Sequence, residues 1–257
     1  MREMNSFSVL TGSDAKQEWL LPWWWDHLHH HHPRASIAFA DFGMTSKAKE
    51  WCRKRGLLID IPEPSMDELP QDRANFWSKK WENSGEREDL LPLRRVWYKK
   101  PMAMALSPFE RTLWVDLDCE VRGPLDALFS LPLNKGKMAM SSVETNRLSQ
   151  GELGEFPHYN TGIALFEKES PLIHLWVREI RIGSQFACTE EDLLAFLIAH
   201  FQIPVVKLPH LYNWEILRFG ANPQAKVYHW MGEKGKQAIR ESQRPTHSSS
   251  APPPTNT

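Results

Sequence analysis

The sequence predicts an α/β fold, in which helices flank a mixed, mainly parallel sheet within a single domain. Three observations support this prediction. Segments with the length and apolarity of buried strands alternate with helical segments early in the chain, an order typical of parallel sheets with crossover helices. The 257 residues suit one large domain. Apolar residues make up 41% of the chain, which is enough to fill a sizeable core.

The first three strands are expected at residues 6–10, 34–40 and 57–61. Between them, a helix is expected from about Lys16 and a second over 45–55, where Gly56 ends it. Residues 63–88 and 145–156 are expected to be irregular, and Thr189 is expected to cap a late buried helix. Further strands are expected at 111–115, 138–143, 160–166, 203–206 and 225–228, and further helices at 93–106, 171–182 and 193–201.

Composition and charge exclude several classes of protein. The formal net charge of -1 offers no basic excess for nucleic acid. The three cysteines (Cys52, Cys119 and Cys188) form no C-x-x-C pair and are expected to be reduced thiols. We expect no signal peptide and no transmembrane segment, hence a cytoplasmic protein, with peripheral membrane association left open. The folded domain is expected to span 1–242, with halves of about 1–118 and 119–242, and 243–257 to be a disordered tail.

The strongest chemical signal is the D-x-D segment, in which Asp116 and Asp118 follow the apolar strand at 111–115. On an extended backbone the two carboxylates would share a face. The end of a strand in an open parallel sheet is a common ligand site, and two carboxylates there suit Mg²⁺ or Mn²⁺. A bare D-x-D is also compatible with one aspartate that caps a turn and another that is solvated.

Four blocks in order give this motif a context. They are VLTGSD at residues 9–14, the D-x-D with Pro-Leu and Leu-Phe downstream, the strand NTGIALF at 160–166, and His-x-x-Gly at 229–232 with Lys234 behind it. Together they span nearly all of residues 6–236, and the chain resembles the GT-A-fold glycosyltransferases of family eight, the glycogenin and lipopolysaccharide galactosyltransferase group. The resemblance implies a Rossmann-type GT-A fold.

The resemblance further implies sugar transfer with retention of configuration. The donor would be a nucleotide diphosphate sugar, which in this family is usually UDP-linked. The acceptor, a glycan, lipid or protein, stays unknown. The resemblance assigns the metal, Mn²⁺ or Mg²⁺, to Asp116, Asp118 and His229, and the diphosphate contacts to Gly232 and Lys234. The remaining donor-binding positions that it implies are Thr11, Asp14, Lys99, Asn160 and Gly162. Acceptor pockets are expected in the variable segments at 144–157 and 63–88.

The chain departs from the family at two places. The family has Gly-x-x-Lys in its last block, but the lysine position here is Gly235, so either Lys234 or Lys236 could meet the diphosphate. The family also has Asp-Gln before the buried helix. Here Glu190, Glu191 and Asp192 stand there, with Glu191 in the Gln position as the main catalytic candidate. A carboxylate beside the anomeric carbon could stabilise or attack an oxocarbenium-like centre, although three acids also favour a helix N-terminus.

Other functions stay open at this point. VDLDCEV also resembles the first motif of haloacid dehalogenase-type phosphatases, but that motif usually lies near the N-terminus. A nucleotide-sugar-binding protein without turnover would explain the altered 190–192 segment. A sugar-nucleotidyl transferase lacks support, since there is no Gly-rich N-terminal phosphate loop. The histidine run at 27–32 is interpreted as the end of a helix that can bind metal adventitiously.

Overall fold

The computed structural model describes residues 7–83, 89–143 and 157–244. A seven-stranded sheet, in the order β3-β2-β1-β4-β7-β6-β8, forms its centre. Strand β7 is antiparallel to both β4 and β6, and the other neighbours are parallel, which confirms the mixed, mainly parallel sheet. The strands are β1 (Ser8–Ser13), β2 (Ser36–Asp41), β3 (Leu57–Asp60), β4 (Arg111–Val115), β6 (Met138–Val143), β7 (His158–Glu167) and β8 (Val206–Leu208).

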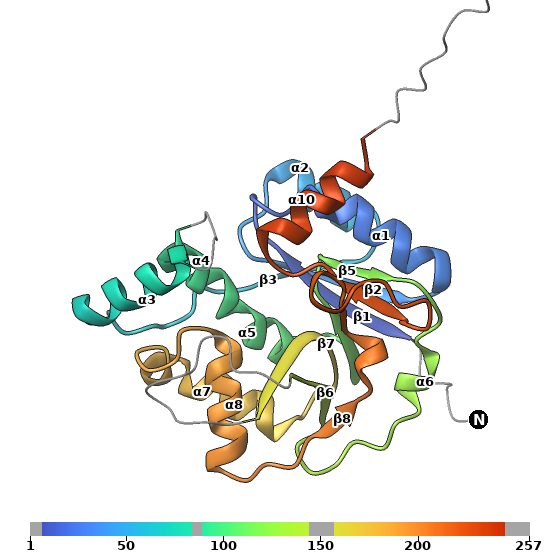
Figure 1. The fold of residues 1–257 in the computed structure, drawn as a ribbon. Helices are drawn as coiled ribbons and strands as arrows, with labels where there is room; N and C mark the ends of the chain where they lie inside the picture. Colours follow the sequence, from blue (N-terminus) through green and yellow to red (C-terminus); the bar gives the residue numbers. More distant parts are fainter. Residues whose placement is uncertain (1–6, 84–88, 144–156, 245–257) are drawn as a thin grey trace, which may run out of the picture.

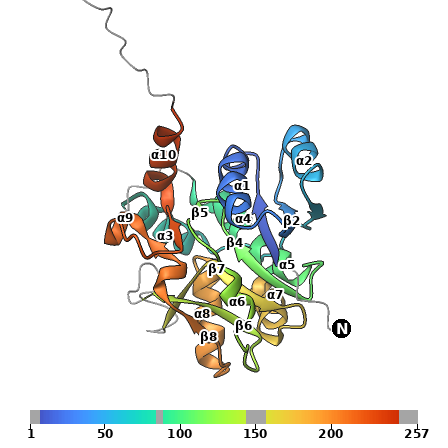
Figure 2. The ribbon, with the colours of Figure 1, turned by 90° about the vertical axis from the view of Figure 1, so that its right-hand side faces the viewer.

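Helices cover both faces of this sheet because its strands carry apolar residues on both sides. Along β1, Val9 packs into one core cluster and Leu10 into the other. The first cluster includes apolar residues of α1 (Leu20–His31), α2 (Ser46–Arg53), α6 (Asp126–Phe129) and α10 (Gly232–Ser242). The second includes those of α5 (Lys99–Ala105), α7 (Pro171–Gly183) and α8 (Glu190–His200). Figure 1 shows α1, α2 and α10 above the sheet and α7 and α8 below it, and Figure 2 shows the same arrangement turned by 90°.

A second, three-stranded sheet brings the late part of the chain to the D-x-D segment. It consists of β5 (Cys119–Val121), β10 (Val227–His229) and β9 (Trp214–Glu215), in the order β5-β10-β9. Strand β10 runs antiparallel to β5, with His229 opposite Cys119. The register therefore places a histidine beside Asp118, which is 111 positions earlier in the sequence.

Most of the expected elements are present within about three residues, although α1 begins at Leu20 rather than near Lys16. The segment expected to be irregular contains α3 (Gln71–Asn83), on which Ala74 and Trp77 are buried at helical spacing. The helix expected at 93–106 is divided at Tyr98 into α4 (Leu90–Trp97) and α5, rather than near Pro101. Pro101 lies in the first turn of α5, where its missing N–H has no intrahelical partner to lose.

Several further short elements and one longer helix were not expected from the sequence. Helix α10 follows β10 directly, and α9 (Ile216–Phe219) with the 3₁₀ turn His210–Tyr212 flanks β9. The D-x-D segment is a turn between β4 and β5, closed by a hydrogen bond from the Cys119 amide to the Asp116 carbonyl at 3.0 Å, and not an extended strand end. The loop expected at 145–156 and the tail beyond residue 244 lie outside the described residues.

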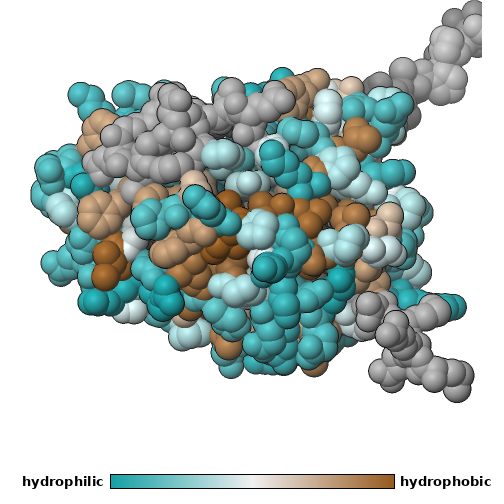
Figure 3. All heavy atoms as spheres, turned by 90° about the horizontal axis from the view of Figure 1, so that it is seen from below, coloured by the Kyte–Doolittle hydropathy of each residue, from teal (hydrophilic) through white to brown (hydrophobic). Residues whose placement is uncertain are grey.

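The surface seen from below carries apolar residues across its middle, with polar residues around them (Figure 3). Ile182 at the end of α7 and Phe201 after α8 are among the exposed large apolar side chains. Scattered exposure of this kind is ordinary for folded proteins. Over the described part of the chain, no helix combines the length and the apolar character needed to cross a lipid bilayer.

Candidate active site

One cavity of about 680 Å³ gathers most of the residues that the sequence singles out. It lies where the carboxyl ends of β1 and β4 meet the amino end of antiparallel β7, the edge at which α/β sheets commonly bind ligands. The second sheet and the N-termini of α8 and α10 complete its wall. The predicted site residues that line it are Asp14, Asp116, Asp118, Asn160, Glu190, Glu191, Asp192, His229, Gly232, Lys234 and Lys236.

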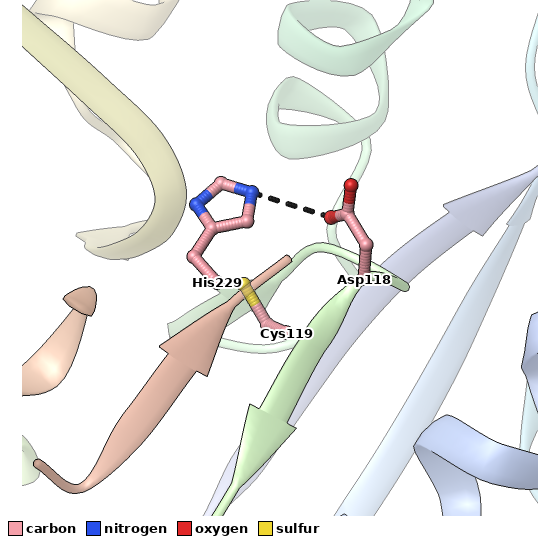
Figure 4. A group of neighbouring side chains, drawn as sticks. All are labelled: Asp118, Cys119 and His229. Carbon is pink, nitrogen blue, oxygen red and sulfur yellow. Dashed lines mark ion pairs between the residues drawn. The ribbon is translucent and has the colours of Figure 1, made fainter. Parts of the chain in front are cut away.

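Asp118 and His229 meet at one side of this cavity (Figure 4). The Nε2 atom of His229 lies 3.2 Å from the Oδ1 atom of Asp118. Burial acts to raise the pKa of the Asp118 carboxyl, but the contact with His229 outweighs it, and the pKa lies below its usual range. Burial likewise acts to lower the pKa of His229, and the nearby Asp118 raises it above its ordinary value. The backbone fixes the pair, because the Trp230 amide donates to the Asp118 carbonyl at 2.9 Å.

A chain of amide side chains sets the orientation of the His229 ring. The backbone N–H of Gly162 donates to Oδ1 of Asn160 at 2.8 Å, and Nδ2 of Asn213 donates to the same oxygen at 2.7 Å. The remaining oxygen of Asn213 must therefore accept from Nδ1 of His229, at 2.9 Å. Because the first donor is a backbone amide, the direction of every bond in the chain follows. The lone pair of a neutral His229 is thus on Nε2, which faces Asp118.

Gly162 provides the space that the His229 ring occupies. A Cβ atom at position 162 would lie 2.3 Å from Cε1 and 2.6 Å from Nδ1 of His229. Any other residue would displace the ring or the strand. Gly162 itself is not part of the cavity wall, so its contribution to the site acts through His229.

Asp118 and His229 offer oxygen and nitrogen atoms of the kind that hold a divalent cation. Together with Cys119 they form a group in which one ligand atom from each residue lies within 4.8 Å of the others. Burial raises the pKa of the Cys119 thiol well above its ordinary value, so this sulfur stays protonated and does not offer a thiolate. A carboxylate oxygen suits Mg²⁺ or Mn²⁺, and a neutral imidazole nitrogen suits transition-metal ions such as Mn²⁺.

Asp116 faces a different partner. Its Oδ2 atom accepts from Nζ of Lys100 at 3.0 Å, and its Oδ1 atom accepts from Nε1 of Trp114 at 2.6 Å. The same lysine donates to Oγ1 of Thr161 at 3.1 Å and lies 3.6 Å from Oε1 of Glu190. Burial acts to lower the pKa of Lys100, but the surrounding carboxylates raise it above its ordinary value. Lys100 therefore remains charged and neutralises the acidic side of the cavity.

The three acids at the start of α8 have different environments. Oε1 of Glu191 accepts from the Thr161 backbone amide at 2.6 Å and from its hydroxyl at 2.7 Å. Glu190 is buried, which raises its pKa to about 7 even though Lys100 opposes this shift. Asp192 forms a capping box with Thr189, because its side chain accepts from the Thr189 amide at 3.0 Å. Asp192 thus stabilises the helix end, while Glu191 is held at the cavity wall.

Helix α10 directs its N-terminus toward the cavity. Gly232 has φ +74°, a conformation that favours glycine. The residue before it, Met231, makes no side-chain capping bond, so the first backbone N–H groups have no such cap. Gly235 is buried, and a Cβ atom there would lie 2.0 Å from the backbone oxygen of Trp230. This close approach explains why no lysine stands at position 235.

The lysines on either side of Gly235 both line the cavity, but their surroundings differ. Lys234 is exposed and Lys236 is half-buried. The charge of Lys236 contributes to the lowered pKa of Asp118, after the larger effects of burial and His229. These observations favour Lys236 as the cation nearer to the carboxylate.

Besides Gly162, two predicted residues lie outside the cavity wall, and Asp14, which is on the wall, also has a local role. Thr11 on β1 is fully buried, and its hydroxyl has no hydrogen-bond partner among the residues that the structure describes. Lys99 points to the Phe42 carbonyl at 3.1 Å and to Glu63 at 2.5 Å. Asp14 lines the cavity and also accepts from the amides of the turn that follows it. Lys100, the residue after Lys99, lines the cavity in place of Lys99. The helix break at Tyr98 decides which of the two lysines faces the cavity.

No protein-family model matches the sequence, and no match was found among curated proteins. Among solved structures, the chain is similar to the galactosyltransferase LgtC in complex with donor and acceptor sugar analogues. The TM-score is 0.61 at 13% identity, covering 91% of this chain and 94% of LgtC. A structure of an active-site glutamine-to-glutamate mutant of LgtC gives a TM-score of 0.59 at 14% identity, covering 92% and 95%.

Two other structures show the same likeness. The glycosyltransferase GlyE of Streptococcus pneumoniae TIGR4 has a TM-score of 0.55 at 15% identity, covering 93% of this chain and 62% of GlyE. Mouse xyloside xylosyltransferase 1 has a TM-score of 0.51 at 10% identity, covering 88% and 97%. At these identities the likeness establishes the fold. The chain has the mixed α/β fold of these glycosyltransferases, as the sequence predicted.

Proposed function

We propose that this protein is a metal-dependent glycosyltransferase that moves a sugar from a nucleotide diphosphate donor, UDP-linked, to a hydroxyl acceptor with retention of configuration. The meeting of Asp118 and His229 at 3.2 Å carries the proposal. Asp118 lies in the turn between β4 and β5, His229 ends β10, which pairs with β5, and the orientation of His229 turns Nε2 toward Asp118, where the two could hold a cation together. They lie in a cavity of a fold that is shared with glycosyltransferases.

In this proposal the diphosphate lies between the Asp118–His229 pair and the N-terminus of α10. The backbone N–H groups near Gly232 and the positive end of the helix dipole favour an anion there. Lys236 adds a charge close to Asp118, and Lys234 adds one at the rim. Gly12 and Asp14, at the end of β1, line the same cavity and would face the nucleoside.

Asp118 and His229 would hold the divalent ion, and Asp116 would join them by releasing one of its present hydrogen bonds. The bound ion supplies positive charge where the leaving diphosphate gains negative charge. Lys100 remains paired with the acidic residues in either arrangement, because it reaches Asp116, Thr161 and Glu190 at once. Its role is to keep carboxylates charged and in place within a largely buried site.

The transfer breaks the bond between the anomeric carbon and the diphosphate oxygen, and the electron pair stays on that oxygen. A bond forms between the anomeric carbon and the acceptor oxygen, and the acceptor proton ends on the released diphosphate. The anomeric carbon would lie beside Glu191, whose Oε2 atom takes no part in the two Thr161 contacts. A carboxylate at that place stabilises an oxocarbenium-like centre by its charge.

The family resemblance assigns its glutamine position to Glu191, and one of the similar structures, a mutant of LgtC, likewise carries glutamate for an active-site glutamine. Thr161 holds Oε1 of Glu191 with two short hydrogen bonds, which favour the ionised form. Burial nonetheless raises the pKa of Glu191 above its usual range. We propose a direct catalytic contribution for Glu191, an electrostatic one for Glu190, and a helix-capping one for Asp192.

The experiment that tests this function measures donor binding and turnover together. Purified protein is titrated with Mn²⁺ and a panel of nucleotide diphosphate sugars, with the melting temperature and nucleotide release as readouts. One donor should give a metal-dependent shift and a slow release of the nucleotide diphosphate. Asp118→Ala should abolish both, and Asp26→Ala, which removes an exposed carboxylate on α1, should leave both unchanged.

Two outcomes would point elsewhere. Donor binding without release or transfer would indicate a nucleotide-sugar-binding protein. Full activity of Asp118→Ala would contradict the proposed metal site outright. A phosphatase of the haloacid dehalogenase type is not favoured, since the aspartates here are surrounded by elements of a glycosyltransferase-like fold.

A further inference from the structure

The histidine run ends helix α1, which lies above the sheet in Figure 1, and its side chains have different surroundings. His32, the C-terminal cap of the helix, is buried, and its Nε2 atom accepts from the Leu125 backbone amide at 3.0 Å. The ring of His29 stacks on Trp25, with centroids 4.9 Å apart and planes inclined by 15°. These two histidines therefore have packing contacts of their own.

His27 and His31 form a pair on another part of the helix surface. They are four positions apart in α1, and side chains at that spacing are neighbours on one helix face, with Cβ atoms about 5–6 Å apart. Both side chains are half-buried, and neither lines the cavity that holds the proposed active site. The pair thus brings two imidazoles together at a place that the proposed function does not use.

A backbone hydrogen bond fixes the tautomer of His27. Its Nδ1 atom lies 2.7 Å from the Trp23 carbonyl oxygen. A carbonyl oxygen only accepts, so Nδ1 carries the proton and the lone pair of the neutral ring is on Nε2. The Trp23 ring packs on the imidazole, with centroids 4.6 Å apart. Histidines that bind metals usually donate their other N–H to a carbonyl or carboxylate in this way.

The surroundings of His31 favour its neutral form. Burial lowers the pKa of this imidazole, and the charges of His30 and His27 lower it further. Because a metal ion binds only the neutral ring, a lowered pKa leaves His31 ready to bind near neutral pH. The pair also lies at the C-terminal end of α1, where the helix dipole favours a cation. Lys226, which also lowers this pKa, is the neighbouring charge that opposes a cation.

We propose that His27 and His31 form a second metal site, separate from Asp118 and His229, that takes a late first-row divalent ion such as Zn²⁺, Ni²⁺ or Cu²⁺. Water completes the coordination shell. Imidazole suits these ions, whereas Mn²⁺ is at the weak end of the affinity series and Mg²⁺ prefers oxygen. The two sites therefore select different ions. An ion bound to both rings bridges consecutive turns and holds the end of α1 in its helical form.

The test measures Zn²⁺ binding to the full chain by isothermal titration calorimetry near neutral pH. His27→Gln and His31→Gln should each weaken this binding at least about tenfold, because each removes one ligand. His29→Gln is the matched control, since it removes a histidine of the same run that stacks on Trp25, and it should bind as wild type does. Circular dichroism of each variant shows that it is folded.

Two further variants separate this site from the cavity and test its charge balance. Asp118→Ala should keep the Zn²⁺ affinity that His27→Gln and His31→Gln lose. With Cu²⁺, its electron paramagnetic resonance spectrum should show two nitrogen ligands. Lys226→Ser removes the opposing charge and should tighten Zn²⁺ binding about threefold at low salt.

Three results would overturn the inference. Equal losses in the variants of His27, His29 and His31 would show that the run binds metal without a defined site. Unchanged binding in both His27→Gln and His31→Gln would remove the site itself. Loss of Zn²⁺ binding in Asp118→Ala alone would place the ion in the cavity. Mn²⁺ binding is measured in parallel, and its absence in wild type would contradict the proposed function but not this site.

Discussion

Replacing Gly162 by alanine gives the sharpest test of the site geometry. The added Cβ atom would lie 2.3 Å from Cε1 of His229, whereas ordinary contacts begin at 3.4 Å. The ring must therefore retreat by at least about 1.1 Å. Metal–ligand distances tolerate only about 0.2 Å. The backbone at Gly162 is not in the left-handed region, so strand β7 itself accepts alanine.

We expect Gly162→Ala to fold and to bind Mn²⁺ at least about a hundredfold more weakly than wild type, because the ring can no longer present Nε2 beside Asp118. Free Mn²⁺ measured by electron paramagnetic resonance during a titration reports the affinity. Gly123→Ala is the control, since its Cβ meets only the flexible Lys226 side chain, at 3.2 Å. Wild-type affinity in a folded Gly162→Ala protein would refute the assignment of His229 as a ligand.

Three other predictions concern single side chains. Burial raises the pKa of Glu190 to about 7, so the neutral form of its side chain favours folding. This contribution to the free energy of unfolding is complete below the ordinary pKa of 4.5 and is lost as the pH rises through about 7. The free energy of unfolding of Glu190→Gln, measured with urea, should therefore rise relative to that of wild type by up to about 3 kcal/mol from pH 5 to pH 8. An equal difference between the two proteins at both pH values would contradict the raised pKa. Asn213→Ala removes the acceptor for Nδ1 of His229, and the Mn²⁺ affinity should fall about tenfold to a hundredfold. The lost buried hydrogen bonds also lower the melting temperature, so the affinity is measured at a temperature at which circular dichroism shows the variant folded. Lys236→Ala should raise the donor KM about tenfold, and Lys234→Ala less, since Lys236 is the one that acts on Asp118; the reverse order would place the diphosphate at the rim.

The order of strands and helices could largely be predicted from the sequence, because apolar periodicity and capping residues are local signals. The strand at 111–115 and the late helix after Thr189 appear as expected. Helix α3 was missed although Ala74, Trp77 and Trp81 have helical spacing. Helix α10 was missed because Gly232 and Gly235 look like loop residues, whereas one begins the helix and the other allows a close backbone approach.

The candidate site was predicted in part. The D-x-D segment and His229 were identified from their motif context, and the structure brings Asp118 and His229 together. Lys100 was missed in favour of Lys99, since no local pattern shows at which residue the helix breaks. Asn213 carried no signal at all, because its role depends on three residues that are distant in the sequence.

The sequence by itself determined the α/β class, the positions of most elements, and a set of acidic, basic and histidine residues that suit a nucleotide-sugar site. These follow from short-range preferences, which act within a few residues of the chain. Tertiary structure alone decided that β10 pairs with β5 in the register that joins His229 to Asp118, that Gly162 makes room for the ring, and that Lys100 faces inward. Such contacts depend on how separate elements pack, and packing is a property of the whole chain.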